Sequence, residues 1–400
     1  MTRLYIVARN STDSVTHGFL PAAAQLGLPV TLVTDAPEDH QSVYAALAHA
    51  PAEIISCQVN DAQALISCIK RYHRPLAIFS NSDHLQAETA LAAAYFGLPG
   101  KGWQSALRSK NKALMRQTLA DLRLDSVAFA EFSAGVDPTT LEVNHIPYPV
   151  VLKPRQGVAS EDVFLARDQA ELKAGIRAVQ ARGKWDDWLL EEYLPGQLYT
   201  LETVGDGKQT WVLGGFRTSL SKLPYFIEKQ VEWETGLSQS IKAVVLDQLA
   251  ALGVDFGSCH TEFVVAEGRP RLIEVNYRLI GDHCDFLLAD LLEMPLFELI
   301  LRLHLGESLP GQPPATQRWA LVDYIIAEAS GTLVSAPADL DLETAGVKLN
   351  YRSLCSIGDR IQITHSNRDY LGILRTIGPD QERCRAAVAD FRSNQQWQIV

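Results

Sequence analysis

The segment RLIEVNYRL, residues 271–279, combines strand-forming residues with polar groups at every second position. Glu274, Asn276 and Arg278 therefore share one face of an extended segment. If the preceding AEGRP turn reverses the chain, Glu262 lies nearly opposite Glu274. Like charges across an antiparallel ladder repel, and a cation between them removes the repulsion. Two carboxylates and an amide oxygen suit Mg²⁺, which completes its shell with water and phosphate. The alternative is two solvated glutamates.

A second segment, VVLKPRQGVAS at residues 150–160, offers a partner for phosphate groups. Lys153 ends a buried-type strand, where a phosphate can neutralise its ammonium group. The loop that follows, with Gly157, Ala159 and Ser160, can present backbone N–H groups to anionic oxygens. The Walker A pattern is absent. An ordinary exit from a strand into a turn is the alternative.

A third segment, LLEEYLPG at residues 189–196, is an apolar strand that ends in acids and a turn. Its backbone can hydrogen-bond an adenine edge while Leu194 packs on the base. An ordinary edge of a sheet is again the alternative.

Three further positions have open roles. His260 shares a strand face with Glu262 and either orients a substrate or is a satisfied, partly buried histidine. Asp282 either caps the next helix, which we favour, or receives an amino group. In NSDH, residues 81–84, Ser82 or Asp83 caps a helix, or the segment lies where open α/β sheets bind ligands.

The composition bounds the protein class. A chain of 400 residues with 47% hydrophobic and 21% charged residues is typical of a soluble globular protein of two or three domains. The net charge of −11 argues against nucleic-acid and anionic-membrane partners. We find neither a signal-peptide pattern nor an apolar run of membrane-spanning length. Six scattered cysteines without CxxC spacing predict reduced thiols in a cytoplasmic protein.

The elements that must position these residues begin with an alternation of strands and helices. We predict strands at 3–9, 29–35, 53–59 and 75–81, and helices near 17–27, 41–50, 61–73 and 83–97. This βαβ pattern predicts a parallel sheet. The turn after the first strand lacks GxGxxG, which argues against NAD. A linker helix with a basic face is predicted over 102–122.

Downstream, strands and helices no longer alternate regularly. A small α+β unit is predicted near 125–195, with a helix near 168–181 and strands at 148–154, 162–166 and 187–194. Two strands joined by a turn are predicted over 258–276, and helices near 238–252, 282–293, 295–305 and 380–395. The proline-rich stretch 309–317 indicates a boundary.

The three segments, in this order and spacing, resemble the ATP-grasp superfamily over roughly residues 1–305. The similarity is strongest to its carboxylate–amine ligases, such as bacterial L-amino-acid ligases and siderophore or peptide-metabolite synthetases. The resemblance implies an α/β and α+β architecture. Its expected parts are a Rossmann-like pre-ATP-grasp domain (1–105), a linker helix and lid subdomain (106–195), a catalytic subdomain whose antiparallel sheet binds metal (196–308) and a small C-terminal α+β domain (309–400).

The resemblance also implies roles for individual residues. ATP would contact Lys112, Lys153, Gly157, Ala159, Ser160, Glu191, Glu192, Tyr193 and Leu194. Two Mg²⁺ or Mn²⁺ ions would bind Glu262, Glu274 and Asn276. Arg278 would hold the transferred phosphoryl group, with Lys153 as the second catalytic cation, and Arg217 is a candidate for a substrate carboxylate. The chain departs from the family pattern at Ala159 and Asp162, where the lid loop usually carries glycine, and near Leu198, where an acid for the ribose is usual.

The implied activity is that of an ADP-forming carboxylate–amine ligase. It would activate a carboxylate as an acyl phosphate and join it to an amine, with an amino acid or polycarboxylic metabolite as substrate in peptide or siderophore biosynthesis. An ATP-grasp carboxylase or acyl-CoA ligase, and a non-catalytic nucleotide-binding module, are the alternatives. The expected partners are small molecules. A homodimer stays open, because the sequence contains no interface signal.

Overall fold

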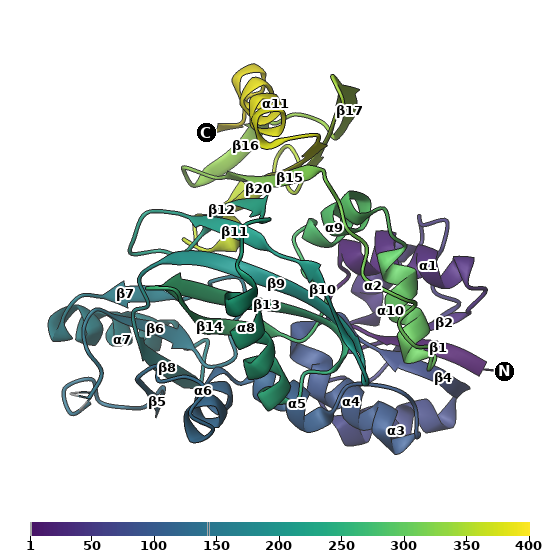
Figure 1. The fold of residues 1–400 in the computed structure, drawn as a ribbon, viewed down its shortest axis with the longest axis horizontal. Helices are drawn as coiled ribbons and strands as arrows, with labels where there is room; N and C mark the ends of the chain where they lie inside the picture. Colours follow the sequence, from purple (N-terminus) through teal and green to yellow (C-terminus); the bar gives the residue numbers. More distant parts are fainter. Residues whose placement is uncertain (1, 142, 144) are drawn as a thin grey trace.

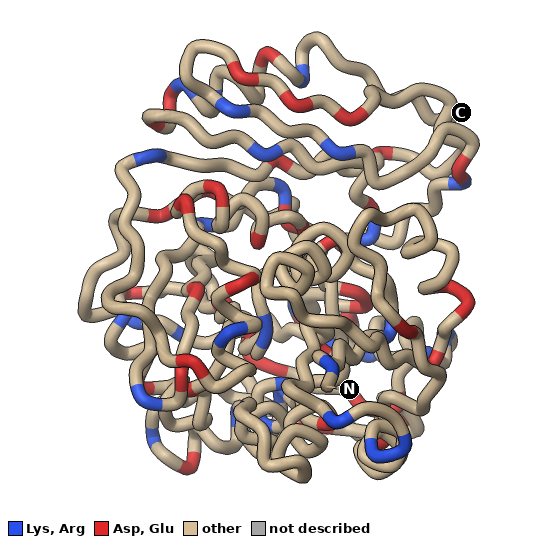
Figure 2. The backbone as a smooth tube through the Cα atoms, turned by 90° about the vertical axis from the view of Figure 1, so that its right-hand side faces the viewer, with Lys and Arg blue, Asp and Glu red and all other residues tan. Residues whose placement is uncertain are grey.

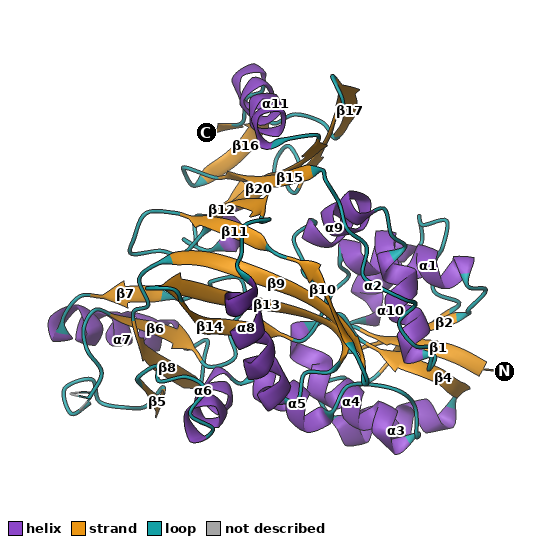
Figure 3. Cartoon of the chain, in the orientation of Figure 1, coloured by secondary structure: helices purple, strands orange, loops and turns teal. Residues whose placement is uncertain are grey.

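The computed structural model describes residues 2–141, 143 and 145–400. Its N-terminal part is a parallel sheet in the order β3-β2-β1-β4, flanked by helices on both sides (Figure 3). The strands are β1 (Thr2–Val7), β2 (Val30–Thr34), β3 (Glu53–Ser56) and β4 (Arg74–Phe79). The helices are α1 (Leu20–Gln25), α2 (Pro37–Tyr44), α3 (Ala62–Arg71) and α4 (Gln86–Tyr95). The parallel sheet is confirmed. Helix α2 begins earlier than predicted because Pro37 suits the first turn.

The predicted linker helix is wrong as a single element. It is two helices, α5 (Trp103–Lys110) and α6 (Lys112–Asp121), separated by Asn111. The Asn111 side chain accepts hydrogen bonds from the backbone N–H groups of Ala113 and Leu114, at 3.1 and 3.2 Å. An asparagine that caps one helix in this way leaves the helical conformation of the preceding one.

A second, antiparallel sheet in the order β5-β8-β6-β7 forms the part that we call the lid sheet. Its strands are β5 (Phe129–Ser133), β6 (Val150–Pro154), β7 (Phe164–Ala166) and β8 (Asp187–Glu192), and helix α7 (Gln169–Arg182) packs on it. Three strands and the helix were predicted. Strand β5 was missed because FAEFS contains no β-branched residue and only weak alternation.

The largest sheet has ten antiparallel strands, ordered β14-β13-β9-β11-β12-β15-β20-β18-β17 with β10 paired to β9 (Figure 1). The strands that precede the proline-rich stretch are β9 (Gln197–Asp206), β10 (Thr210–Gly214), β11 (Phe216–Leu220), β12 (Glu228–Trp233), β13 (Phe256–Ala266) and β14 (Arg269–Asn276). In the register, Glu262 lies opposite Glu274 and His260 lies opposite Asn276. The predicted pairing of the two glutamates is therefore confirmed.

The same sheet continues past the proline-rich stretch. Strand β15 (Trp319–Ile326) pairs with β12, and β20 (Tyr370–Gly378), β18 (Val347–Ser353) and β17 (Leu340–Thr344) follow. A small sheet of β16 (Gly331–Ser335), β19 (Arg360–Ile361) and β21 (Gln398–Ile399) accompanies them. The remaining helices are α8 (Gln239–Leu252), α9 (Cys284–Leu292), α10 (Leu296–His304) and α11 (Gln381–Asn394). The predicted domain bounds stay a prediction. The large sheet contains strands from both sides of the predicted boundary at residue 309.

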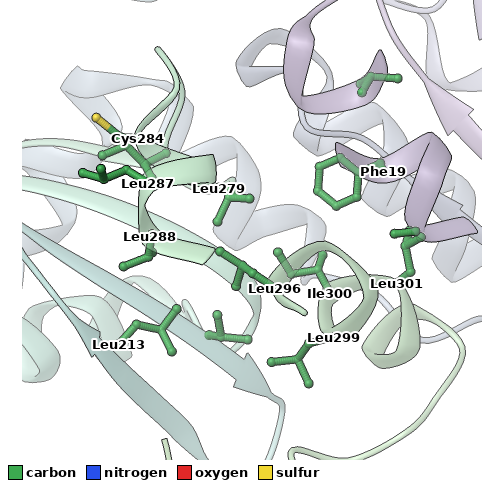
Figure 4. Packing of buried hydrophobic residues seen from close by; sticks show 14 of the residues in the cluster. Phe19, Leu213, Leu279, Cys284, Leu287, Leu288, Leu296, Leu299, Ile300 and Leu301 are labelled. Atoms are coloured by element: carbon green, nitrogen blue, oxygen red, sulfur yellow. The ribbon is translucent and has the colours of Figure 1, made fainter. Parts of the chain in front are cut away.

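A buried hydrophobic cluster joins the N-terminal unit to the large sheet. Phe19 from the N-terminal unit, Leu287 on α9, Ile300 on α10 and Leu213 on β10 all contribute to it (Figure 4). The Phe19 ring meets the ring of Phe297 edge-on, at 5.0 Å between centroids. Burying each side chain of this size stabilises the fold by about 1.5–3 kcal/mol. The cluster thereby joins the end of β4, at Phe79, with the segment that follows β14, at Leu279 and Ile280, in one core.

Charged positions of both signs are interspersed along the backbone (Figure 2). All six cysteines are free thiols. Among the described residues, no helix combines the length and the apolar character that crossing a bilayer requires.

Candidate active site

A cavity of about 470 Å³ lies between the lid sheet and the large sheet, within the size range of ligand pockets. Apolar side chains line part of it, among them Val151 from the lid sheet, Ile273 from the large sheet and Phe226 from the segment between β11 and β12. Most of the predicted nucleotide contacts line this nucleotide-sized cavity: Lys112, Lys153, Gly157, Ser160, Glu191, Glu192, Tyr193 and Leu194. Ala159 lines an adjoining cavity instead.

The Glu191 side chain is held by two cations rather than being free for a base. Its Oε2 atom lies 2.5 Å from Lys153 Nζ, and its Oε1 atom lies 2.6 Å from Arg116 Nε. All three groups are buried. Burial alone would raise the pKa of Glu191, but Arg116 and Lys153 lower it to about 2. The same burial lowers the pKa of Lys153, and Glu191 opposes this. Glu191 therefore orients Lys153 towards the cavity.

Two predicted donors to the base are already engaged. The backbone N–H of Glu192 donates to the Ala128 carbonyl at 3.0 Å, and that of Tyr193 donates to the Pro149 carbonyl at 2.9 Å. Both bonds fix the end of β8 within the lid. Any contact of these two residues with a bound base must use other atoms.

The loop over residues 157–162, which we call the phosphate loop, is connected to strand β14 through Lys112. Lys112 Nζ donates to the Gly157 carbonyl at 2.9 Å and lies 2.8 Å from Glu274 Oε1. Ala159, Ser160 and Asp162 have φ values of 56°, 53° and 55°. This left-handed conformation favours glycine, and side chains adopt it at an energetic cost. Ala159 and Asp162 occupy the positions at which the resemblance leads us to expect glycine.

A second, polar cavity of about 170 Å³ adjoins the first and shares Glu228, Glu262 and Glu274 with it. The predicted residues Ala159, Ser160, His260, Asn276, Arg278 and Asp282 also line it, together with Asp83, Tyr324 and Asn367. This set brings the C-terminal end of β14 together with residues from the N-terminal unit and the C-terminal segment.

Arg278 is held in this polar cavity by an acid from the N-terminal unit. Its Nε and Nη2 atoms donate to the two carboxylate oxygens of Asp83, at 2.9 and 2.7 Å. Burial opposes ionisation of Asp83, but Arg278 and then Lys110 lower its pKa to about 2. Neither Ser82 nor Asp83 caps a helix through its side chain. The ligand-side alternative for NSDH is the one that the geometry favours.

Two other sequence interpretations need correction. Asp282 does not cap α9, because that helix begins at Cys284 and Asp282 has a left-handed φ of 51°. Arg217 lines neither cavity and instead pairs with Glu232. Strand alternation explains this, since the neighbouring Thr218 faces both cavities.

His260 lies buried between two carboxylates. Its Nδ1 atom lies 2.8 Å from Glu202 Oε1, and its Nε2 atom lies 3.4 Å from Glu262 Oε1. Burial alone would lower the pKa of His260, but Glu202 and then Glu262 raise it to about 10. The satisfied histidine is therefore the better of its two interpretations, although the residue does line the polar cavity.

The donor set fits a divalent cation. The Asn276 amide lies between Glu262 Oε1, 3.4 Å from its nitrogen, and two carboxylate oxygens of Asp83 and Glu274, each 3.3 Å from its other end. In either orientation, the amide oxygen faces a carboxylate. A cation between these oxygens removes that repulsion, and Mg²⁺ typically takes one or two protein carboxylates. The set depends on this amide oxygen, since the described residues contain no group of three or more His, Cys, Asp or Glu suited to a metal.

Sequence reasoning missed Glu228, which lies at the junction of the two cavities. Burial, followed by the nearby carboxylates of Glu262 and Asp282, raises its pKa to about 8. No local signal marks it, because these neighbours come from other strands and loops. Asn367 was missed for the same reason. Asp83 was noted as part of NSDH, but its partner Arg278 was not foreseen.

Comparisons with known proteins identify the fold. Residues 131–282 match the family model described as "ATP-grasp domain". The chain is 26% identical to the uncharacterised protein y4rH of Sinorhizobium fredii over 343 residues, 83% of this chain and 70% of that protein. It is 22% identical to dapdiamide A synthase of Enterobacter agglomerans over 302 residues, 71% of this chain and 70% of that protein.

Among solved structures, an L-amino acid ligase from Bacillus licheniformis superposes with a TM-score of 0.80 at 21% identity. The match covers 100% of this chain and 99% of that one. The protein therefore contains an ATP-grasp domain and has the ATP-grasp fold, as the sequence resemblance predicted.

Proposed function

We propose that this ATP-grasp protein is an ADP-forming carboxylate–amine ligase. The observation that carries the proposal is the meeting of the two cavities at Glu228, Glu262 and Glu274. The larger cavity has the size and the lysines that a nucleoside triphosphate needs. The smaller one is polar and contains Arg278, so it can hold the group that receives the phosphoryl unit.

ATP and Mg²⁺ or Mn²⁺ are the cofactors that this arrangement supports. Glu262, Glu274 and Asn276 would hold the metal, which would screen the negative charge between phosphate and substrate carboxylate. Lys112 neutralises Glu274 in the structure at 2.8 Å. A metal bound at Glu274 would therefore free Lys112 to face a phosphate oxygen.

The reaction would proceed in two steps. A carboxylate oxygen attacks the γ-phosphorus of ATP, the bond to the bridging oxygen breaks, and ADP leaves. The amine then attacks the acyl carbon, phosphate leaves, and the amine loses a proton. Lys153 and Arg278 contribute by positioning and electrostatic stabilisation, as is usual in phosphoryl transfer. The lid sheet and phosphate loop limit hydrolysis of the acyl phosphate by excluding water.

The likeness to an L-amino acid ligase and to dapdiamide A synthase supports small-molecule substrates. We propose an amino acid or a polycarboxylic metabolite as the carboxylate donor, in peptide or siderophore biosynthesis. Six free thiols support a cytoplasmic setting.

The test is an oxygen-transfer experiment. Purified protein is incubated with ATP and Mg²⁺ and with pools of ¹⁸O-carboxylates alone, amines alone, or both. A ligase gives ADP, an amide of the dehydrated mass, and phosphate that carries ¹⁸O from the carboxylate. Label in AMP would mean adenylation and refute the acyl-phosphate route. Turnover that requires bicarbonate or coenzyme A, tested in separate arms, would favour the other ATP-grasp reactions. Nucleotide binding without turnover would favour a non-catalytic module.

A further inference from the structure

A short turn of the C-terminal segment, residues 364–369, reaches into the site. Its shape is set by Asp369, which is 3% exposed. The two carboxylate oxygens of Asp369 accept hydrogen bonds from the backbone N–H groups of Thr364 and His365, both at 2.8 Å. The His365 ring stacks on Tyr225 with 4.0 Å between centroids. The turn is thus rigid in itself and packed against the edge of the site.

This C-terminal turn contacts both sides of the junction between the cavities. The Asn367 backbone N–H donates to the Ala159 carbonyl in the phosphate loop at 3.0 Å. The Asn367 side-chain oxygen accepts from the backbone N–H of Glu228 at 3.1 Å. Arg368 Nε donates to Glu161 Oε1 at 2.7 Å. One turn therefore connects the phosphate loop with the strand that carries Glu228.

The phosphate loop needs such external support. Ala159, Ser160 and Asp162 hold left-handed backbone conformations without being glycine. Conformations of this kind persist only where the surrounding structure enforces them. The carbonyl of Ala159 itself accepts the bond from Asn367, so the support acts at a strained residue.

We propose that the C-terminal turn is a positioning element of the active site. Through Asn367 and Arg368 it keeps the phosphate loop in its left-handed conformation and aligned with Glu228. The position of the phosphate loop beside the nucleotide cavity and the shape of the polar cavity are thereby linked. The inference rests on the proposed function for its catalytic consequence, but the hold on the loop can be measured independently.

The first test needs no turnover. Trypsin cleavage after Arg155, two residues before the phosphate loop, is followed by mass spectrometry in the wild type and in a double variant, Asn367→Pro with Arg368→Ala. Proline removes both the backbone N–H that bonds Ala159 and the side-chain oxygen that bonds Glu228, and it suits the first position of this helical turn. Cleavage requires local opening, so loss of these contacts should increase its rate about tenfold. The control is Asn350→Ala on β18, whose half-buried side chain bonds only to Asp341 among the described side-chain hydrogen bonds. An unchanged cleavage rate in a folded double variant overturns the proposal.

The second test uses the strained, left-handed backbone of Ala159. Ala159→Gly relieves the left-handed penalty, so we expect it to recover part of the lost protection against trypsin when added to the double variant. Purely additive effects would contradict a hold on Ala159. In the ligase assay, the double variant should release more ADP per amide formed than the wild type does. If the wild type forms no amide, the proposed function fails while the cleavage tests still decide the role of the turn.

Discussion

Replacing Glu191 by glutamine removes the negative charge between Arg116 and Lys153. The wild-type carboxylate is 3% exposed and contacts these cations at 2.6 and 2.5 Å. Its pKa falls from 4.5 to about 2 on folding, which corresponds to about 3 kcal/mol of stability at neutral pH. Breaking a buried ion pair on one side costs about 3–5 kcal/mol, which is of the same size. We therefore expect Glu191→Gln to lower the free energy of unfolding by about 3 kcal/mol or more at pH 7.

The pH dependence of that difference has a definite sign. The pKa of Glu191 is depressed in the folded state, so its contribution is full above the unfolded pKa and is lost as the pH falls towards 2. Between pH 7 and pH 4, the stability difference between wild type and variant should shrink by about 1 kcal/mol. Urea unfolding at both pH values, followed by tryptophan fluorescence, measures it.

The matched control is Glu131→Gln in the neighbouring strand β5. Glu131 pairs with Arg155 at 3.3 Å, but its side chain is 45% exposed, so the change should stay within about 1 kcal/mol. Equal urea midpoints for Glu191→Gln and wild type at pH 7 would refute the buried-cluster argument. A difference that grows on acidification would refute the assigned sign.

Three further predictions concern the site. Glu274→Gln should reduce turnover at least about a hundredfold by removing a metal ligand, and normal steady-state activity would contradict that role. Circular dichroism should show that the fold survives the loss of the ion pair between Lys112 and Glu274. Arg278→Lys should reduce ligation because lysine cannot bind Asp83 with two parallel bonds, and the ratio of amide to ADP measures this; an unchanged ratio would count against the role of Arg278. Arg217→Ala should leave the KM values for both substrates unchanged within about twofold, since the residue lies outside both cavities and its buried partner Glu232 keeps a second cation, Arg385, at 2.6 Å; a large KM increase would restore it as a substrate contact.

Local pattern was sufficient to predict several features. The period of two along RLIEVNYRL and the length of the AEGRP turn together predicted that Glu262 faces Glu274, because a hairpin's register follows from its turn and its buried face. Alternating strands and helices predicted the parallel N-terminal sheet, because parallel strands are usually joined by a crossover helix. Asn111 shows the limit of periodicity, since a capping side chain outweighed the helical pattern around it.

The electrostatic partners, by contrast, were decided only by the tertiary structure. Asp83 meets Arg278 across 195 positions of the chain, and Glu191 meets Arg116 across 75. Asn367 approaches Ala159 from a segment that the sequence assigned to a separate domain. Sequence spacing determined which residues share a strand face or a turn, since those relations depend on a few neighbouring dihedral angles. The packing of separate sheets determined which charges are buried together, because that depends on how distant apolar faces, such as those of Phe19 and Phe297, fit against each other.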